Sequence, residues 1–133
     1  IVYTIHSYWP SQFTHQIDKS KTLLQWPSPE KEWDVDGLRN ALQRVREFQQ
    51  KTGARILVGE FSAIRWAPGA DRYLEDSMRL FEEYDWDWCY HAFREWNGWS
   101  VEHSDNPGDD QMDPDNARKR ALLQGLKRNC ELR

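Results

Sequence analysis

The chain has 133 residues and a formal net charge of −4, from 22 acidic and 18 basic side chains. It contains no block of like charges and no basic stretch interleaved with aromatic residues, which argues against nucleic-acid binding. The apolar runs are much shorter than a membrane span, and the first residues lack a signal-peptide pattern, so we expect one soluble domain. Eight tryptophans stand out, because tryptophan fills cores and also forms flat surfaces for amphipathic ligands.

The first third of the chain predicts a strand, a long loop and a helix. Residues 1–8 are β-branched and aromatic, which is typical of a strand. The polar stretch 9–33 has three prolines and no steady period, and it is far longer than the usual connection of about four to six residues. Helical spacing over 36–51 then predicts a helix, with Asp34 or Asp36 available as its cap.

The second predicted strand ends on a charge. Residues 56–59 form an apolar run, typical of a strand buried on both faces, and Glu60 follows directly. A charged group placed there loses hydration, so it needs either a partner or a task. An ion pair to Arg65 or Arg94 and a catalytic role are both compatible with the sequence. A helix over 70–84 is predicted next.

The last third predicts a third strand over 86–93, a polar loop over 94–112 and a final helix. Asp113 is the expected cap of that helix, with Pro114 at its first position. Strands that alternate with helices pair in parallel through right-handed crossovers. We therefore expect an α/β fold with a three-stranded parallel sheet. Its two bare edges indicate that the chain is part of something larger.

No metal site and no cofactor is predicted. The acidic stretch 104–116 lacks the ligand spacing of a known calcium loop, so a solvated turn is preferred. The four histidines include no close-spaced pair on a helix, which argues against zinc. Cys89 lies in an aromatic strand and Cys130 near the end of the last helix. Both are expected to pack rather than to form a disulfide framework.

Polar side chains end each predicted strand. In parallel α/β folds, chemistry gathers at the carboxyl ends of the strands. His6 and Tyr8 end the first strand and share a face, because they are two residues apart. Glu60 ends the second strand, and His91 lies on the third. A carboxylate that faces an imidazole and a phenol across neighbouring strands predicts a catalytic cluster.

Three segments together resemble glycoside hydrolase family 5, the cellulase-like (β/α)8 barrels: YTIHSYWPSQFTHQ, ILVGEFS and WDWCYHAFREWNGWS. They are similar, in order and spacing, to the last three strands of that family. The resemblance implies that residues 1–133 are a C-terminal fragment of a glycoside hydrolase barrel domain. They would form three βα units of a (β/α)8 TIM barrel that is incomplete in this chain, since a whole barrel takes about 250 residues.

By resemblance, Glu60 is the nucleophile of a retaining glycosidase. His6 and Tyr8 match the His-x-Tyr pair of the sixth strand. Retaining enzymes use two carboxyl groups about 5–5.5 Å apart, and the nucleophile forms a covalent glycosyl intermediate. A hydrogen bond from Tyr8 would keep Glu60 ionised and oriented. His6 would bind a sugar hydroxyl or hold Tyr8.

The same resemblance implies a sugar platform in the last loop. Trp96 is the best match to the tryptophan that lies beneath the sugar in the family. Trp99 and His91 are close enough in the sequence to compete for that role. Trp66 follows Glu60 closely and is expected to border the cleft.

The acid/base Glu of the family, at the end of its fourth strand, has no counterpart here. Glu95 or Glu102 is the alternative within this chain; otherwise the Glu and the first five strands come from another chain or segment. The implied function is a retaining, endoglucanase-like hydrolase of β-linked plant polysaccharide, secreted or periplasmic by resemblance, and nearly inactive as this chain alone. The alternative is a non-catalytic carbohydrate-binding or scaffold fragment.

Overall fold

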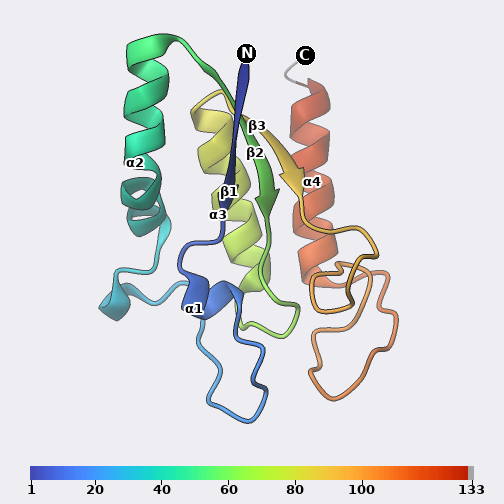
Figure 1. Cartoon of the computed structure of the whole chain (residues 1–133). Coiled ribbons are helices and arrows are strands. Elements are labelled where there is room, and N and C mark those ends of the chain that lie inside the picture. Colours follow the sequence, from blue (N-terminus) through green and yellow to red (C-terminus); the bar gives the residue numbers. More distant parts are fainter. Residues whose placement is uncertain (132–133) are drawn as a thin grey trace.

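Three parallel strands pack against three long helices in this computed structural model, which describes residues 1–131, and the side chains of 1–129 (Figure 1). The strands lie side by side in chain order: β1 (Val2–Ser7), β2 (Arg55–Phe61) and β3 (Asp87–Tyr90). The helices cover one face of the sheet: α2 (Val35–Thr52), α3 (Ala70–Glu83) and α4 (Ala117–Glu131). The loop after β1 holds α1 (Ser11–Thr14) and the short 3-10 helix η1 (Pro29–Lys31). The predicted parallel α/β order is confirmed.

Helix α2 begins and ends as its sequence indicates. Of the two predicted caps, Asp34 performs the role, because its carboxylate accepts a hydrogen bond of 2.9 Å from the backbone N–H of Gly37. Gly53 ends the helix in the left-handed conformation, with φ of 67°. Leu38 and Leu42 turn one face of the helix into the core.

Helix α4 begins three residues later than the predicted first helical position. Its cap is Asn116, whose side-chain oxygen accepts a hydrogen bond of 3.0 Å from the backbone N–H of Lys119. The amide nitrogen of the same side chain donates to the carbonyls of Val101 and Asp113, at 2.6 and 2.7 Å. A carboxylate cannot donate in this way, so the predicted cap, Asp113, is wrong. The asparagine caps the helix and also fixes the preceding loop.

The hydrophobic core lies between the sheet and the helices. Helix α3 supplies much of it: Ala70, Tyr73, Leu74, Met78, Leu80 and Phe81. From β2 come Ile56, Val58 and Phe61. Burial continues past the strand, since every residue of 61–67 is buried. The segment that follows Glu60 is therefore anchored in the core and is not a surface loop.

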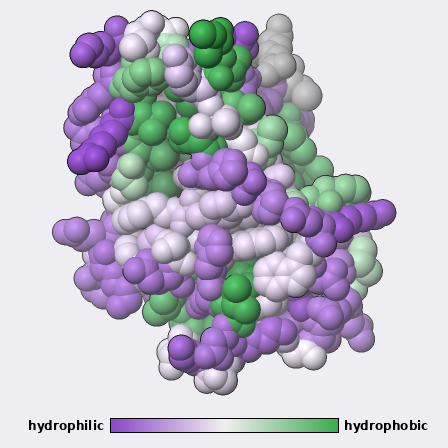
Figure 2. Space-filling model, in the orientation of Figure 1, coloured by the Kyte–Doolittle hydropathy of each residue, from purple (hydrophilic) through white to green (hydrophobic). Residues whose placement is uncertain are grey.

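The second face of the sheet is left open by the described residues. Val58, which is buried, pairs with Trp88, so Asp87 and Cys89 point to the open face. Cys89 is accordingly exposed, and the prediction that it packs is wrong. The side chain of Cys130 lies outside the described part of the chain. Figure 2 shows this open face, where hydrophobic side chains gather around the beginning of the strands.

A β-bulge at Gly59 sets the direction of Glu60. The pairing of β1 with β2 passes from Ile5 opposite Val58 to His6 opposite Glu60, which leaves Gly59 without a partner on β1. One extra residue in a strand moves the following side chain to the other face of the sheet. The bulge therefore places Glu60 on the same face as His6.

Both edges of the sheet carry exposed apolar side chains. Beside β1, the rings of Tyr3 and Phe48 meet edge to face at 5.0 Å, and both are partly exposed. On the opposite flank, Leu123 and Leu126 of α4 are exposed. Among the described helices, none combines the length and the apolar composition needed to cross a membrane. These flanks are suited to contact further protein.

The bulge gives a first prediction. An added Cβ at Gly59 would lie 2.6 Å from Thr4 Oγ1, so Gly59→Ala should lower the free energy of unfolding by about 1–3 kcal/mol in a urea titration. Thr4→Ala should suppress part of that loss. The control is Gly53→Ala, which meets no atom within 4 Å and whose cost, from its positive φ, should not respond to Thr4→Ala. Equal stability of Gly59→Ala and the original chain would contradict the steric argument.

The bare edges give a second prediction. In sedimentation velocity, the isolated chain should associate as its concentration rises, because two strand edges and their apolar flanks are uncovered. The double variant Tyr3→Ser, Phe48→Ser should associate less. A cooperative, monodisperse monomer at high concentration would instead indicate an α/β domain that is stable on its own.

Candidate active site

Three polar side chains meet at the carboxyl ends of β1 and β2. The Tyr8 hydroxyl donates a hydrogen bond of 3.0 Å to Oε2 of Glu60. His6 Nδ1 lies 3.4 Å from the same oxygen. The Glu60 side chain is 33% exposed and that of His6 is 55% exposed. The structure thus brings the predicted cluster together, with the carboxylate held from one side and accessible to solvent.

No arginine or lysine pairs with Glu60 within the described residues. Arg94 pairs instead with Glu102, its Nε lying 2.8 Å from Oε2. The side chain of Arg65 is fully buried and turns toward the loop that precedes α4. The ion-pair interpretation of Glu60 is therefore wrong. Its charge is met by a phenol and an imidazole, and both leave it accessible.

Tyr8 is fixed in its protonated, donating form. Burial raises the pKa of Tyr8 well above its usual value, and the hydrogen bond to Glu60 raises it further. A phenolate beside a carboxylate would be repelled by it, so the phenol keeps its proton at any working pH. Tyr8 consequently acts as a permanent donor to one oxygen of Glu60.

An aromatic wall extends from this donor. It consists of Tyr8, His15, His91, Trp96 and Trp99, all on the loops that follow β1 and β3. The Trp99 ring lies 5.8 Å from that of Tyr8 and 5.6 Å from that of Trp96. Trp96 is 41% exposed, and its ring is the most open indole of the wall. The wall thus connects an exposed indole to the oxygen of Glu60 through ring contacts.

His15 is a member of the wall that sequence reasoning missed. Its ring lies 4.9 Å from that of Tyr8 and 5.1 Å from that of Trp99. Its position is set by the buried Thr14, whose Oγ1 lies 2.8 Å from His15 Nδ1 and donates to the Tyr8 carbonyl. Burial lowers the pKa of His15, which favours a neutral ring. No local sequence pattern marked His15, because its place in the wall depends on a contact with Trp99, which is distant in the sequence.

His91 lies just beyond β3, because that strand ends at Tyr90, earlier than predicted. The His91 ring is 6.4 Å from Tyr8 and 6.2 Å from Trp99, and its Nε2 is 3.3 Å from Glu95. Tyr90 supports the wall from below by donating its hydroxyl proton to the carbonyl of Trp99. Burial raises the pKa of Tyr90 to about 12, so this donor is also permanent.

The prediction that Trp66 borders the cleft is wrong. It is only 5% exposed, and its Nε1 donates a hydrogen bond of 2.9 Å to the carbonyl of Gln16. Its ring meets that of Trp96 edge-on at 6.3 Å. Trp66 thus supports Trp96 from inside the protein and offers no free face for stacking.

Of the two alternative acids in the last loop, Glu102 lacks the property of a proton donor. The ion pair with Arg94 lowers the pKa of Glu102, whereas a general acid at neutral pH needs a raised pKa. Glu95 is largely exposed and lies against His91. Glu102 is therefore unsuited to be the acid/base carboxyl that complements the nucleophile candidate.

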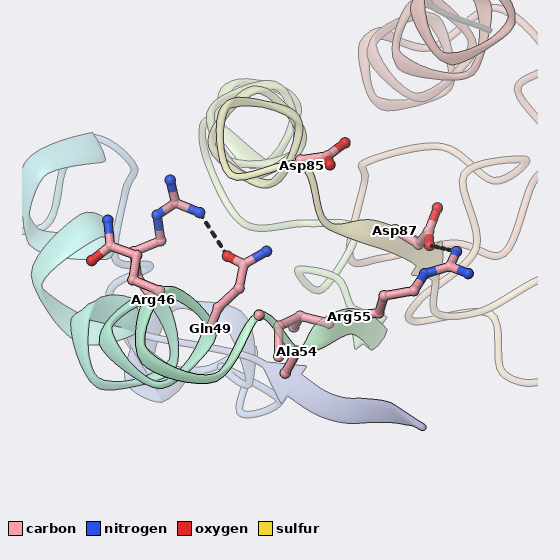
Figure 3. Close-up of a pocket in the computed structure, with 9 residues that line it drawn as sticks. Arg46, Gln49, Ala54, Arg55, Asp85 and Asp87 are labelled. Atoms are coloured by element: carbon pink, nitrogen blue, oxygen red, sulfur yellow. Dashed lines mark hydrogen bonds and ion pairs between the residues drawn. The ribbon is translucent and has the colours of Figure 1, made fainter.

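A separate cavity lies at the other end of the sheet. It has a volume of about 580 Å³ and opens where β2 and β3 begin (Figure 3). Its walls carry two short polar contacts, Arg46 to Gln49 at 2.6 Å and Arg55 to Asp87 at 3.4 Å. Parallel α/β folds place their chemistry at the carboxyl ends of the strands, so this cavity is not the candidate active site.

Comparisons with known proteins give solved structures as the only matches. No family model and no curated protein matches the sequence. A structure of Thermotoga maritima Cel5A in complex with mannotriose is 25% identical, with a TM-score of 0.68 over 94% of this chain. A hyperthermophilic endo-β-1,4-glucanase in complex with substrate is 26% identical, with a TM-score of 0.68 over 92% of the chain. The cellulose synthase subunit Z of Clostridioides difficile is 20% identical, with a TM-score of 0.69, and shows the fold alone.

The match covers much less of the other proteins. The chain spans 39% of the Cel5A chain and 39% of the endo-β-1,4-glucanase. Its three parallel βα units are therefore an incomplete part of a barrel. Structure and comparison together confirm the resemblance: the chain has the fold of the C-terminal part of a glycoside hydrolase family 5 (β/α)8 barrel.

Proposed function

We propose that this chain supplies the nucleophile half of a retaining glycoside hydrolase that acts on β-linked polysaccharide. The observation that carries the proposal is the Glu60 carboxylate, accessible at the end of β2 and held by Tyr8 at 3.0 Å, with no arginine or lysine paired to it among the described residues. Similarity to endoglucanase structures supports it, two of them bound to mannotriose or cellobiose. A secreted or periplasmic location is part of the proposal.

In this reaction Glu60 attacks the anomeric carbon of the sugar. One Glu60 oxygen forms a bond to that carbon as the glycosidic C–O bond breaks, which gives a covalent glycosyl intermediate. The electron pair of the broken bond goes to the leaving oxygen, which takes a proton from the acid/base carboxyl. A water molecule, deprotonated by the same carboxyl, then releases the sugar and frees Glu60.

Tyr8 and His6 prepare Glu60 for that attack. The phenol of Tyr8 binds Oε2 and fixes the plane of the carboxylate. His6 is more than half exposed and lies beside the same oxygen, so its imidazole can also receive a sugar hydroxyl. Groups held in place before the reaction reduce the reorganisation needed in the transition state.

Trp96 provides the sugar platform in this proposal. Its indole is exposed and is braced edge-on by Trp99 at 5.6 Å and by Trp66 at 6.3 Å. The apolar face of a pyranose ring packs on an aromatic face of this kind. Trp99 and His91 line the interval between the platform and Tyr8.

The remaining barrel units complete the site. A retaining enzyme needs its acid/base carboxyl about 5–5.5 Å from the nucleophile. Glu102 has a lowered pKa, and the family resemblance puts the acid/base Glu at the end of the fourth strand, so we assign that Glu to barrel strands on another chain or segment. The chain by itself should then bind sugar weakly and hydrolyse it very slowly.

Replacement of the nucleophile is the central prediction. In the completed barrel, Glu60→Ala should lower kcat on an activated aryl β-glycoside by more than about a thousandfold, because no covalent intermediate forms. Cellobiose affinity should change little. Added azide should restore turnover of Glu60→Ala and yield the α-glycosyl azide. The matched control is Glu95→Ala, another exposed carboxylate, which should keep most of its turnover.

The aryl leaving group needs little protonation, so this assay isolates the nucleophile. Wild-type turnover by Glu60→Ala would remove the proposal. The chain would then be a carbohydrate-binding or scaffold fragment that has an aromatic wall and no chemistry of its own.

Another prediction concerns the hydrogen bond by which Tyr8 orients Glu60. Tyr8→Phe should lower kcat by about ten- to a thousandfold, which is the range for one preorganised donor, because Glu60 stays in place. The KM for the aryl glycoside should change much less. Tyr3→Phe, which alters a tyrosine at the far end of β1, is the control. An unchanged kcat in Tyr8→Phe would contradict the orienting role.

A further inference from the structure

A buried guanidinium holds the loop that connects the aromatic wall to α4. The Arg65 side chain is fully buried and donates to four acceptors. Nη1 binds the carbonyls of Ser104 and Asn106, the latter at 2.7 Å. Nη2 binds the carbonyl of Asp109 and, at 3.0 Å, the carboxylate of Asp110. Burying a charge is costly unless it is hydrogen-bonded in this manner.

The four acceptors lie in the acidic stretch that invites a calcium interpretation. Three carbonyl oxygens and one carboxylate oxygen converge there, as oxygens do around a hard cation. The guanidinium of Arg65 fills that position. Within the described residues, no group of three or more His, Cys, Asp or Glu is placed to hold a metal ion. The loop 104–110 is therefore held around a cation of the chain itself, supplied by the buried segment that follows β2.

The same arginine reaches the sugar platform by two routes. Its backbone N–H donates a hydrogen bond of 2.8 Å to the carbonyl of Gly98. The Trp96 ring lies directly on Gly98, since an added Cβ there would be 2.4 Å from ring carbons. The Arg65 guanidinium also lies 5.2 Å from the centre of the Trp66 ring, which supports Trp96.

A second cation ties the loop after β1 to the same point. Lys19 Nζ lies 4.5 Å from the centre of the Trp66 ring and donates a hydrogen bond of 2.5 Å to the carbonyl of Pro107. Trp66 is thus contacted by two cations, Lys19 from the loop after β1 and its own sequence neighbour Arg65. Lys19 is on an exposed loop, however, whereas Arg65 is enclosed, so the fixed element of this junction is Arg65.

We propose that Arg65 is a positioning residue for the Trp96 platform. It acts as an internal cation that fixes the loop 98–110 and thereby sets where Trp96 meets the substrate. It touches neither Glu60 nor the sugar. The inference depends on the proposed function for its kinetic readout, but its binding and spectroscopic readouts do not require catalysis.

The test uses Arg65→Lys and Arg65→Met in the completed barrel. Cellobiose affinity is measured by tryptophan fluorescence, and turnover with the activated aryl glycoside. We expect Kd and KM to rise by about three- to thirtyfold in Arg65→Met while kcat stays within about threefold, since ground-state placement and not the nucleophile is altered. Arg65→Lys should fall in between, because an ammonium cannot span four acceptors as a planar guanidinium does.

Further variants separate positioning from folding. Trp96→Ala should add little to the loss of affinity in Arg65→Met, because both remove the same contact. Guanidinium chloride at concentrations well below denaturing ones should restore affinity to Arg65→Ala, and potassium chloride at equal ionic strength should not. Gly98→Ala, which must displace Trp96, is the positive control. Arg39→Met is the negative control, since Arg39 pairs with Glu83 on the surface.

Each arm has a result that would overturn the inference. Arg65→Met with wild-type cellobiose affinity and an unchanged near-ultraviolet circular dichroism of its tryptophans would remove it. Additive losses in Arg65→Met and Trp96→Ala would do the same. Arg65→Met could fail to fold. In that case the inference is rejected if guanidinium does not rescue Arg65→Ala and if Arg65→Lys shows no intermediate effect. If the Glu60→Ala variant kept its activity, the proposed function would be rejected, but the cellobiose-binding experiments would still test the role of Arg65.

Discussion

The structure depends on holding one carboxylate without neutralising it. Glu60 follows the apolar run 56–59, and Arg65 and Arg94 were the arginines expected to pair with it. Arg94 pairs with Glu102, and Arg65 is enclosed by the acidic loop. What reaches Glu60 is the phenol of Tyr8, a donor that carries no charge. Both arginines are thus engaged elsewhere, and the Glu60 side chain stays accessible.

The position of Trp96 and its supports depends on the burial of residues 61–67. Because this segment is part of the core, Trp66 is a rigid support and Arg65 a fixed cation. Trp66 braces the exposed indole of Trp96, and Arg65 holds the loop that continues from Trp96 toward α4. The polar half and the aromatic half of the candidate site therefore share one anchor, which is the segment directly after Glu60. Tyr90 adds a second support under Trp99.

The elements themselves were predictable, because apolar spacing and strand alternation are local signals. The pairing of His6 with Tyr8 followed from a period of two, and Asp34 from its position before an amphipathic helix. What failed depends on contacts distant in sequence. Asn116 replaces the predicted cap because it also binds loop carbonyls, and Trp66 is buried because another loop covers it. No local pattern encodes either contact.

Cys89 has a consequence for following how this fold is completed. Its thiol lies on the open face of the sheet, at the level of the strands, where a closed barrel has its packed interior. A small alkylating reagent therefore distinguishes the open fragment from a closed barrel at one defined atom. Cys89, which the sequence wrongly predicted to be packed, is thus a chemical marker for the inside of a barrel.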